Sequence, residues 1–593
     1  MLVMCYTVIK APQMESRTGY VRYTDTLPIG IVMRASSSKL IVRLFPFLTW
    51  ARPTRRQNRA DAIAGITVGL VLIPQALAYA QLAGMPPVTG LYAALLPGIV
   101  GALFGSSSLL AVGPVALTSL LTFAALQPLA EAGSPEWVVM AIWLALYSGL
   151  MQFLMGAFRM GILANLISNA VVQGFVNAAA VIIIVSQIPA LLGFDTGAGG
   201  NWLSTLWQEW QHAPWRLVAT AGFGLGGVAA LLLLGKLTAR LPAVMVVTLI
   251  GIAGSYLLGF GELGGSVIGP VGSGLPQPSL PLTLSVDQHL ALLLPAAIIA
   301  LISFTEAMSS CRTMSRITGE PWDRNQELIG QGLAKMASGF SGAFPVSGSF
   351  SRTALNAYSG AKTARASLIA SLLVLISLFG FTELLYHLPT AILAAIIIVP
   401  VTRLIDVRSL TRLSRENPKD GMVALVTLVV TLVTVPNLYW GILAGIAASL
   451  LAFLHHHAVP RIIELGVHES GGFRDRHLYQ LPPIAEGVLG VRMDASLTYL
   501  TAPVLERSIR KRVDAAPDLR TVLISASSLN QVDSTGLDTL QDIWSFLDAR
   551  GITLYLSGPK LPLREALSRT GLAQLIKEEN IFATDAKAIE ALT

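Results

Sequence analysis

Two short segments of the chain combine helix-starting residues with small side chains. Residues 113–119 are Gly-Pro-Val-Ala-Leu-Thr-Ser, and residues 347–353 are Ser-Gly-Ser-Phe-Ser-Arg-Thr. Proline suits the first turn of a helix because it has no backbone N–H, and glycine permits close approach of a ligand. A helix that begins in such a segment exposes free N–H groups and behaves like about half a positive charge. Two such helix starts facing one cavity, together with the guanidinium of Arg352, predict a site for a small anion that needs no metal ion.

Arg352 is the strongest support for this anion-site hypothesis. An Arg near mid-membrane costs at least about 2.5–3.5 kcal/mol on insertion scales, so it is rarely kept there without a partner or a water-filled cavity. A bound anion would be such a partner. The alternative for each segment taken alone is that its Gly, Pro and Ser residues only help helices to pack or kink.

Three further polar residues stand in apolar surroundings. Glu306 is the only charged residue of the run 290–311, and a carboxyl there could exchange a proton near neutral pH. The alternative is a fixed ion pair with Arg352 that only joins two helices. Gln75 and Tyr79 are four residues apart on one predicted helix face, where they could orient an oxyanion or simply pack.

Neither a metal-ligand set nor a catalytic pair is visible in the sequence. The two cysteines, Cys5 and Cys311, are far apart, and residues 455–457 are adjacent histidines that would point in different directions around a helix. We therefore predict no enzyme, no metal and no cofactor. The net charge of +7 fits attraction to a membrane surface, and the lack of a basic stripe in a soluble fold argues against nucleic acid.

Long runs without charge place most of the chain in a lipid bilayer. The 593 residues are 53% hydrophobic and 13% charged, whereas soluble domains carry about 25% charged residues. Residues 62–130, 137–158 and 160–194 contain no Asp, Glu, Lys or Arg, and a spanning helix needs roughly 20 apolar residues. Arginines before the first run predict a cytoplasmic N-terminus; they are Arg43, Arg52, Arg55, Arg56 and Arg59.

The apolar segments form two sets of seven. The first set is predicted at 62–80, 88–104, 112–128, 137–157, 163–190, 215–235 and 242–260. The second is predicted at 289–310, 326–342, 350–359, 366–380, 384–401, 421–436 and 438–457. Breaks at residues 74–75 and 113–114 recur at a similar spacing at Glu306 and at 345–348, which is typical of an internal repeat in a transporter. An odd number of spans per set would invert the second copy, and an even total returns the chain to the cytoplasm.

The chain changes character from about residue 471. Buried strands are predicted at 488–493, 521–525 and 552–557, and amphipathic helices at 502–513, 535–549 and 563–568. This alternation predicts a small cytoplasmic α/β domain. We divide the chain into a polar N-terminal extension (1–40), a transmembrane transporter domain (41–460), a linker (461–485) and this C-terminal domain (486–593).

Several motifs resemble the sulfate permease (SulP) family and its animal anion-exchanger relatives. They are Ile-Pro-Gln-Ala-Leu-Ala-Tyr-Ala at 73–80, Gly-Leu-Tyr at 90–92, Phe-Gly-Ser-Ser at 104–107, Gly-Pro-Val-Ala at 113–116, Asn-Gln-Glu-Leu-Ile-Gly-Gln-Gly at 325–332 and Gly-Ser-Phe-Ser-Arg-Thr-Ala-Leu-Asn at 348–356. The resemblance covers roughly residues 40 to 590. The chain departs from it at Thr89 and Ser108, where the family often has Tyr and a basic residue.

This resemblance implies a polytopic all-α membrane domain of fourteen transmembrane segments, built as two inverted repeats of seven, whose core domain moves against a gate domain. It places substrate between the half-helices of segments three and ten. The lining residues implied by position are Gln75, Tyr79, Val115, Ala116, Ser351 and Arg352. Glu306 would be the proton-linked acid of a sulfate carrier. On a sodium-linked carrier, Ser310 could help Glu306 to hold the ion.

Residues 530–536, Asn-Gln-Val-Asp-Ser-Thr-Gly, resemble a loop of the STAS domain, which is similar to bacterial anti-sigma factor antagonists. Ser534 takes the place where those antagonists are phosphorylated. We favour a helix cap for Asp533 and Ser534 over a phosphorylation site. In either case the resemblance implies a regulatory or assembly module with a cytoplasmic partner.

We predict a proton-coupled sulfate symporter that works by alternating access in the inner membrane of the cell. Both termini would be cytoplasmic, and the resemblance implies a homodimer. Sodium-coupled bicarbonate uptake and chloride/bicarbonate exchange on the same fold are the alternatives. A membrane sensor that signals through the STAS domain is a different class of function, and the broken helices and buried charges argue against it.

Overall fold

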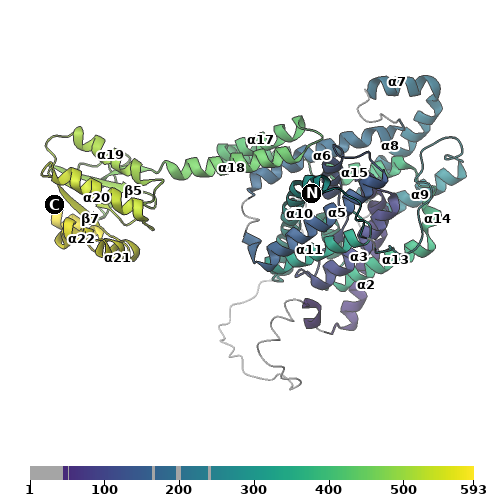
Figure 1. The fold of residues 1–593 in the computed structure, drawn as a ribbon, viewed down its shortest axis with the longest axis horizontal. Helices are drawn as coiled ribbons and strands as arrows, with labels where there is room; N and C mark the ends of the chain where they lie inside the picture. The colour runs from purple at the N-terminus through teal and green to yellow at the C-terminus, as the bar shows by residue number, and fades with distance from the viewer. Residues whose placement is uncertain (1–44, 51, 163–166, 195–201, 238–241, 279) are drawn as a thin grey trace, which may run out of the picture. The chain divides into compact units, whose positions relative to one another are not determined.

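The computed structural model describes residues 45–593, with the exception of 51, 163–166, 195–201, 238–241 and 279 (Figure 1). The predicted polar extension, residues 1–40, lies outside this part of the chain. Residues Met1–Ala51 form a unit separate from Arg52–Thr593, and its described helix is η1 (Pro46–Thr49).

The apolar part of the second unit consists almost entirely of helices. They are α2 (Arg55–Leu82), α3 (Pro87–Phe104), α4 (Ala116–Leu126), α5 (Pro135–Ala157), α6 (Asn169–Leu192), α7 (Trp202–His212), α8 (Pro214–Leu237), α9 (Ala243–Leu257), α10 (Val286–Thr318), α11 (Arg324–Phe340), α12 (Phe350–Tyr358), α13 (Arg365–Gly380), α14 (Thr382–Leu385), α15 (Thr390–Thr402), α16 (Val407–Glu416), α17 (Pro418–Val433) and α18 (Tyr439–Ala458). Two strands of two residues each, β1 (Val112–Gly113) and β2 (Ser347–Gly348), interrupt them.

The helical membrane domain that the sequence predicts is confirmed in its main character. Among the described residues, eight helices are long and apolar enough to cross a bilayer, and three shorter apolar helices accompany them. The exact count of fourteen spans stays a prediction. Local signals explain the ends of the longest helix, α10. Ser285 and Gln288 form a capping box at its start, and Gly319 ends it with a φ of +75°, a conformation that favours glycine.

The same order of elements occurs twice along the chain. A long helix, a second helix, a two-residue strand, a short helix and another helix follow one another as α2, α3, β1, α4, α5 and again as α10, α11, β2, α12, α13. The packing repeats as well: α13 packs on α2 and α3, while α5 packs on α10 and α11. A second group of helices contains α6, α8, α15, α17 and α18, which pack on one another. This order supports the predicted internal repeat.

Small residues allow α5 and α11 to pack with their backbones in contact. A Cβ atom at Gly149 of α5 would lie 2.8 Å from both the carbonyl oxygen of Gly332 and the amide nitrogen of Met336 on α11. A Cβ atom at Gly332 would in turn lie 2.5 Å from the amide nitrogen of Phe153. Interfaces of small residues are a general means of bringing membrane helices together.

The C-terminal domain is built on one six-stranded sheet with the strand order β4-β3-β5-β6-β7-β8 (Figure 1). Its strands are β3 (Ile462–Val467), β4 (Phe473–Asp475), β5 (Val488–Met493), β6 (Thr521–Ser525), β7 (Thr553–Ser557) and β8 (Ile581–Phe582). Strands β5 to β8 are parallel, and β3 is antiparallel to both β4 and β5. The helices are α19 (Ala502–Asp514), α20 (Ser534–Asp548), α21 (Leu561–Arg569), α22 (Leu572–Ile576) and α23 (Asp585–Leu592), with a 3₁₀ turn η3 (Glu578–Asn580).

The core of this domain explains why its strands are strongly apolar. Val491, Val522 and Leu556 of three neighbouring strands are buried against Leu505 of α19 and Leu540 of α20. The predicted strands and helices agree with the structure to within a few residues. The residues predicted as a linker, 461–485, contain β3 and β4, so we propose that the domain begins near Ile462.

The tight α5–α11 interface generates a stability prediction. We expect Gly149→Ala to lower the free energy of unfolding by roughly 1–3 kcal/mol, because the new methyl group has to displace the backbone of α11. The melting temperature of the detergent-purified protein measures this loss. Gly222→Ala on α8 is the matched control, since a Cβ atom there meets nothing within 4 Å. Equal melting temperatures for the two variants would contradict the packing argument.

Candidate functional site

An antiparallel pairing of β1 with β2 brings the two interrupted segments together. Val112 is opposite Gly348, and Gly113 is opposite Ser347. Helix α4 begins directly after β1 at Ala116, and α12 begins directly after β2 at Phe350. Both helices are short, with 11 and 9 residues. The structure therefore places two helix starts beside one small ribbon.

Further hydrogen bonds hold the segment before β1 to the segment after β2. The amide of Ser349 donates to the carbonyl of Ala111 at 2.9 Å, and the amide of Ala111 donates to Oγ1 of Thr353 at 3.0 Å. Nδ2 of Asn356 donates to the carbonyl of Leu109 at 3.1 Å. The hydroxyl of Ser349 caps α12 by accepting from the amide of Arg352 at 3.3 Å. The backbone that precedes each helix is thus held by the other segment.

Arg352 is the largest buried polar side chain at this junction. Only 1% of its surface is exposed, and its Nε and Nη2 atoms have no hydrogen-bond partner among the described residues. A Cβ atom at Gly113 would lie 3.3 Å from Nη2, so the guanidinium lies directly against β1. Unsatisfied buried donors of a charged group cost at least about 1–3 kcal/mol. The arrangement is therefore suited to a ligand that brings acceptor oxygens and negative charge.

Other predicted site residues surround the guanidinium. Tyr79 on α2 is buried and interacts electrostatically with both Arg352 and Glu306. Gln75 lies one turn earlier on α2, is also buried, and its Oε1 atom has no partner in the described part of the chain. Helix α2 packs against both α4 and α12, so its polar face belongs to the same region.

The three predicted residues at the helix starts differ in exposure. Val115 and Ala116 are buried where α4 begins, so their side chains contribute small apolar surface and their backbone contributes the free helix start. Ser351 is exposed in the first turn of α12, and its hydroxyl lies 3.3 Å from that of Ser349. Ser351 is thus the member of this set that faces open space.

Glu306 on α10 lies close to Arg352 without forming an ion pair with it. The carboxylate interacts electrostatically with Arg352 and Lys335, yet no N–O distance of 4.0 Å or less joins Glu306 to Arg352 among the described residues. Its Oε2 atom also lacks a hydrogen-bond partner there. The fixed ion pair considered from the sequence is therefore not formed in this structure. Ser310 is buried, and its hydroxyl donates to the backbone carbonyl of Glu306 at 3.2 Å.

Sequence reasoning missed a second buried cation, Lys335 on α11. This side chain is fully buried, and its Nζ atom donates to Oε1 of Gln152 on α5 and to Oγ of Ser303 on α10. The signal was present, because Lys335 is the only charged residue between Glu327 and Arg352.

Two buried acids were also missed, and both hold backbone amides. Glu327 accepts from the amides of Ser106 at 2.9 Å and Ser107 at 3.1 Å. Asp61 accepts from the amides of Lys362 at 2.6 Å and Thr363 at 3.0 Å. These two acids join segments that are more than two hundred residues apart. Their burial therefore has a structural explanation.

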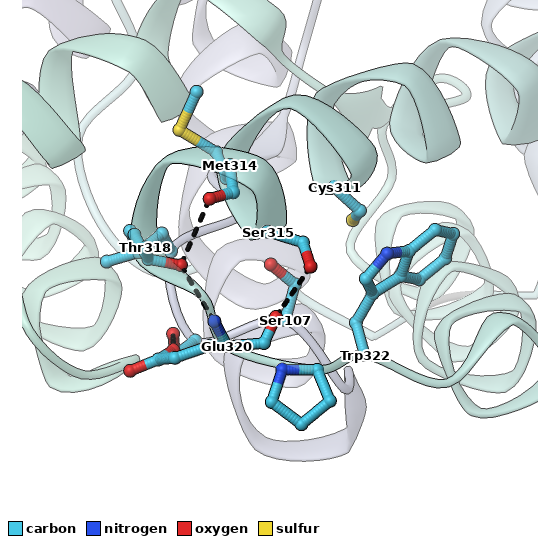
Figure 2. Close-up of a pocket in the computed structure, with 10 residues that line it drawn as sticks. Ser107, Cys311, Met314, Ser315, Thr318, Glu320 and Trp322 are labelled. Atoms are coloured by element: carbon cyan, nitrogen blue, oxygen red, sulfur yellow. Dashed lines mark hydrogen bonds between the residues drawn. The ribbon is translucent and has the colours of Figure 1, made fainter. Parts of the chain in front are cut away.

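A small pocket lies between the C-terminal end of α10 and the turn that follows it (Figure 2). The hydroxyl of Ser315 donates to the carbonyl of Glu320 at 2.7 Å, and the amide of Glu320 donates to Oγ1 of Thr318 at 3.3 Å. Cys311, Trp322 and residues 107–109 also line the pocket. Its volume of about 10 Å³ is close to that of one water-sized sphere. This pocket is too small for an oxyanion and is distinct from the β1–β2 junction.

In the C-terminal domain, Asp533 caps helix α20. Its Oδ1 atom accepts from the amide of Gly536 at 2.8 Å, and its Oδ2 atom accepts from the amide of Tyr499 at 2.8 Å. Ser534 follows as the first residue of the helix and is exposed. The geometry gives Asp533 the structural role that the sequence favoured and leaves the hydroxyl of Ser534 accessible.

Comparisons with known proteins agree with this architecture. Residues 59–427 match the model of the sulfate permease family, and residues 480–588 match that of the STAS domain. A protein of Mycobacterium tuberculosis named "probable sulfate transporter" is 34% identical over 540 residues, which are 91% of this chain and 96% of that protein. "Probable sulfate transporter 4.2" of Arabidopsis thaliana is 31% identical over 92% of this chain and 83% of its own length.

Two solved structures share the fold. The structure of SLC26A9 has a TM-score of 0.84 at 22% identity and covers 95% of this chain and 98% of its own. The transmembrane domain of a cyanobacterium bicarbonate transporter, BicA, has a TM-score of 0.57 at 25% identity and covers 66% of this chain and 98% of its own.

The role of Glu327 can be tested by stability. We expect Glu327→Ala to lower the free energy of unfolding by roughly 1–3 kcal/mol, because the amides of Ser106 and Ser107 lose their acceptor. Thermal unfolding of the purified protein measures the change. Glu131→Ala serves as the control, because Glu131 is exposed. A melting temperature for Glu327→Ala that matches the control would refute the structural role.

Proposed function

The chain belongs to the sulfate permease family, and on this premise we propose that it is a secondary active transporter of small inorganic anions, with sulfate as its substrate. We further propose proton-coupled symport by alternating access. The family consists of permeases, and the chain is not an enzyme. Its relatives named sulfate transporters align over nine-tenths of the chain, which supports sulfate as the first candidate.

The observation that carries the proposal is the unsatisfied guanidinium of Arg352 beside two helix starts. A guanidinium presents its N–H groups in a planar fork that matches a tetrahedral oxyanion in a bidentate manner. The starts of α4 and α12 add partial positive charge without adding a bulky side chain. We assign the substrate site to Gln75, Tyr79, Val115, Ala116, Ser351 and Arg352.

We assign proton coupling to Glu306. An ionised Glu306 offsets part of the positive field of Arg352, because the two buried groups carry opposite charges and interact electrostatically. Protonation of the carboxyl restores that field for a divalent anion. Proton and sulfate therefore bind with positive coupling, and each raises the affinity for the other.

The packing suggests which helices move. The site lies within the group of α2 to α5 and α10 to α13, which we propose as the core domain. The second group, which includes α6, α8, α15, α17 and α18, would be the gate domain. We place the protein in the inner membrane as a homodimer with both termini in the cytoplasm, where the STAS domain could meet a regulatory partner.

Sodium-coupled bicarbonate transport is the second candidate, and the similarity to the bicarbonate transporter BicA favours it. In this case Glu306 and Ser310 would hold the sodium ion. The hydroxyl of Ser310 donates its proton to a backbone carbonyl, which leaves its oxygen lone pairs available to a cation.

Replacement of the guanidinium tests the substrate site. We expect Arg352→Gln to lower the affinity for sulfate at least tenfold, because the charged fork is lost and a neutral amide replaces it. Sulfate stabilises a protein that binds it in the native state, so the rise in melting temperature measures binding when sodium sulfate is kept at low concentration, where its general salt effect on protein stability is small. Arg316→Gln, which changes an exposed arginine in the last turn of α10, is expected to keep the wild-type rise. An undiminished rise in Arg352→Gln would remove Arg352 from the site.

The coupling role of Glu306 is tested in proteoliposomes with labelled sulfate. Wild-type protein is expected to accumulate sulfate when an inward proton gradient is imposed, and not when a sodium gradient replaces it. Glu306→Gln, which imitates the protonated acid, should retain sulfate exchange and lose accumulation driven by acid. Acid-driven accumulation at the wild-type rate in this variant would refute the assignment, and accumulation driven by sodium in the wild type would favour the second candidate.

A further inference from the structure

The buried Lys335 has no counter-charge in direct contact. Its two hydrogen-bond partners, Gln152 and Ser303, are neutral, and no acidic oxygen lies within 4.0 Å of its Nζ atom in the described part of the chain. The side chain is fully inaccessible to solvent. An isolated buried ammonium group is costly, and charged groups within membrane segments usually pair with one another or with backbone carbonyls.

The hydrogen bonds of Lys335 lead directly to the proposed substrate site. Ser303 lies one turn before Glu306 on α10, and its carbonyl accepts from the hydroxyl of Ser347 in β2 at 3.1 Å. The carboxylate of Glu306 interacts electrostatically with both Lys335 and Arg352. One acid is therefore shared between two buried cations, one on α11 and one on α12.

The remaining groups near this trio do not change its charge. Tyr79 on α2 is a neutral phenol close to Arg352 and Glu306, and α5 contributes the neutral Gln152. Glu327, the buried acid of α11, lies about two turns from Lys335 and is bonded to the amides of Ser106 and Ser107. Helix α3, which also packs on α11, contains no Asp, Glu, Lys or Arg.

We propose that Lys335 is a positioning residue that sets the valence of the transported anion through the total charge of the buried trio. This inference rests on the proposed function. With Glu306 ionised, the trio of Glu306, Lys335 and Arg352 carries one excess positive charge, which matches a monovalent anion. With Glu306 protonated it carries two, which match a divalent anion. Because uncompensated charge in a low-dielectric interior is strongly unfavourable, the divalent anion requires the proton.

Removal of Lys335 should shift this balance by one charge. Without Lys335, the site is neutral overall when Glu306 is ionised and carries a single positive charge when Glu306 is protonated. The variant would then bind a monovalent anion together with a proton, whereas a divalent anion would remain uncompensated in both protonation states. Lys335 thus supplies the second positive charge that allows a site with only one arginine in reach of substrate to accept a divalent anion when Glu306 is protonated.

The test compares uptake of labelled sulfate and labelled chloride into proteoliposomes across a range of external pH. We expect Lys335→Gln to lower the ratio of sulfate to chloride uptake at least tenfold and to make chloride uptake increase with acidity. Lys335→Arg keeps the charge and is expected to keep the wild-type ratio and pH profile. A wild-type ratio and pH profile in Lys335→Gln would overturn the inference, because a purely structural lysine would change the amount of folded protein and not these two readouts.

A double variant keeps the inference testable if Lys335→Gln does not fold. Glu306→Gln combined with Lys335→Gln removes one buried charge of each sign, and such paired removal is often tolerated. The double variant should transport chloride in preference to sulfate, and its uptake should not depend on external pH. A preference for sulfate in the double variant would overturn the inference. If the wild type transports no sulfate under any gradient, the proposed substrate is wrong, and the pH profiles of chloride uptake in Lys335→Gln and Lys335→Arg still decide the role of the lysine.

Discussion

A guanidinium group buried among transmembrane helices is the constraint on which the rest of this structure depends. Arg352 is almost entirely buried, and two of its nitrogen atoms find no acceptor in the described part of the chain. The surrounding elements supply a place for such a charge: two short helices, a two-stranded ribbon and the polar face of α2. The protein thereby keeps an uncompensated positive charge that a bound anion can neutralise, and the surrounding helices hold this charge in place.

Much of this arrangement could be predicted from the sequence, for identifiable reasons. The helix breaks at residues 113–114 and 345–348 combine glycine or proline with an apolar context, and Arg352 and Glu306 are conspicuous because charge is so rare around them. The C-terminal domain was visible because strands and amphipathic helices alternate with different periods. These signals are local, so they can be recognised in the sequence without knowledge of the fold.

The features that were missed depend on contacts between distant parts of the chain. Glu327 is held by the backbone of Ser106, 221 residues away, and no pattern near either residue indicates that pairing. Lys335 is the only charged residue between Glu327 and Arg352, but its helix is amphipathic, and a lysine on such a helix ordinarily faces water. Strands β3 and β4 acquire their regular structure by pairing, β3 with β5 and β4 with β3. The helices α4 and α12 are shorter than a membrane span, so the number of apolar segments does not by itself give the number of spans.

The ribbon between β1 and β2 has a mechanical consequence for any transport cycle. Because α12 is joined by hydrogen bonds to the segment that precedes β1, and β1 is paired with β2, the starts of α4 and α12 cannot move apart without breaking the ribbon. We therefore expect the starts of α4 and α12 to move together with the ribbon as one unit. In the proposed alternating-access cycle, exposure to one side of the bilayer or the other would then come from sliding or tilting of this unit relative to the surrounding helices.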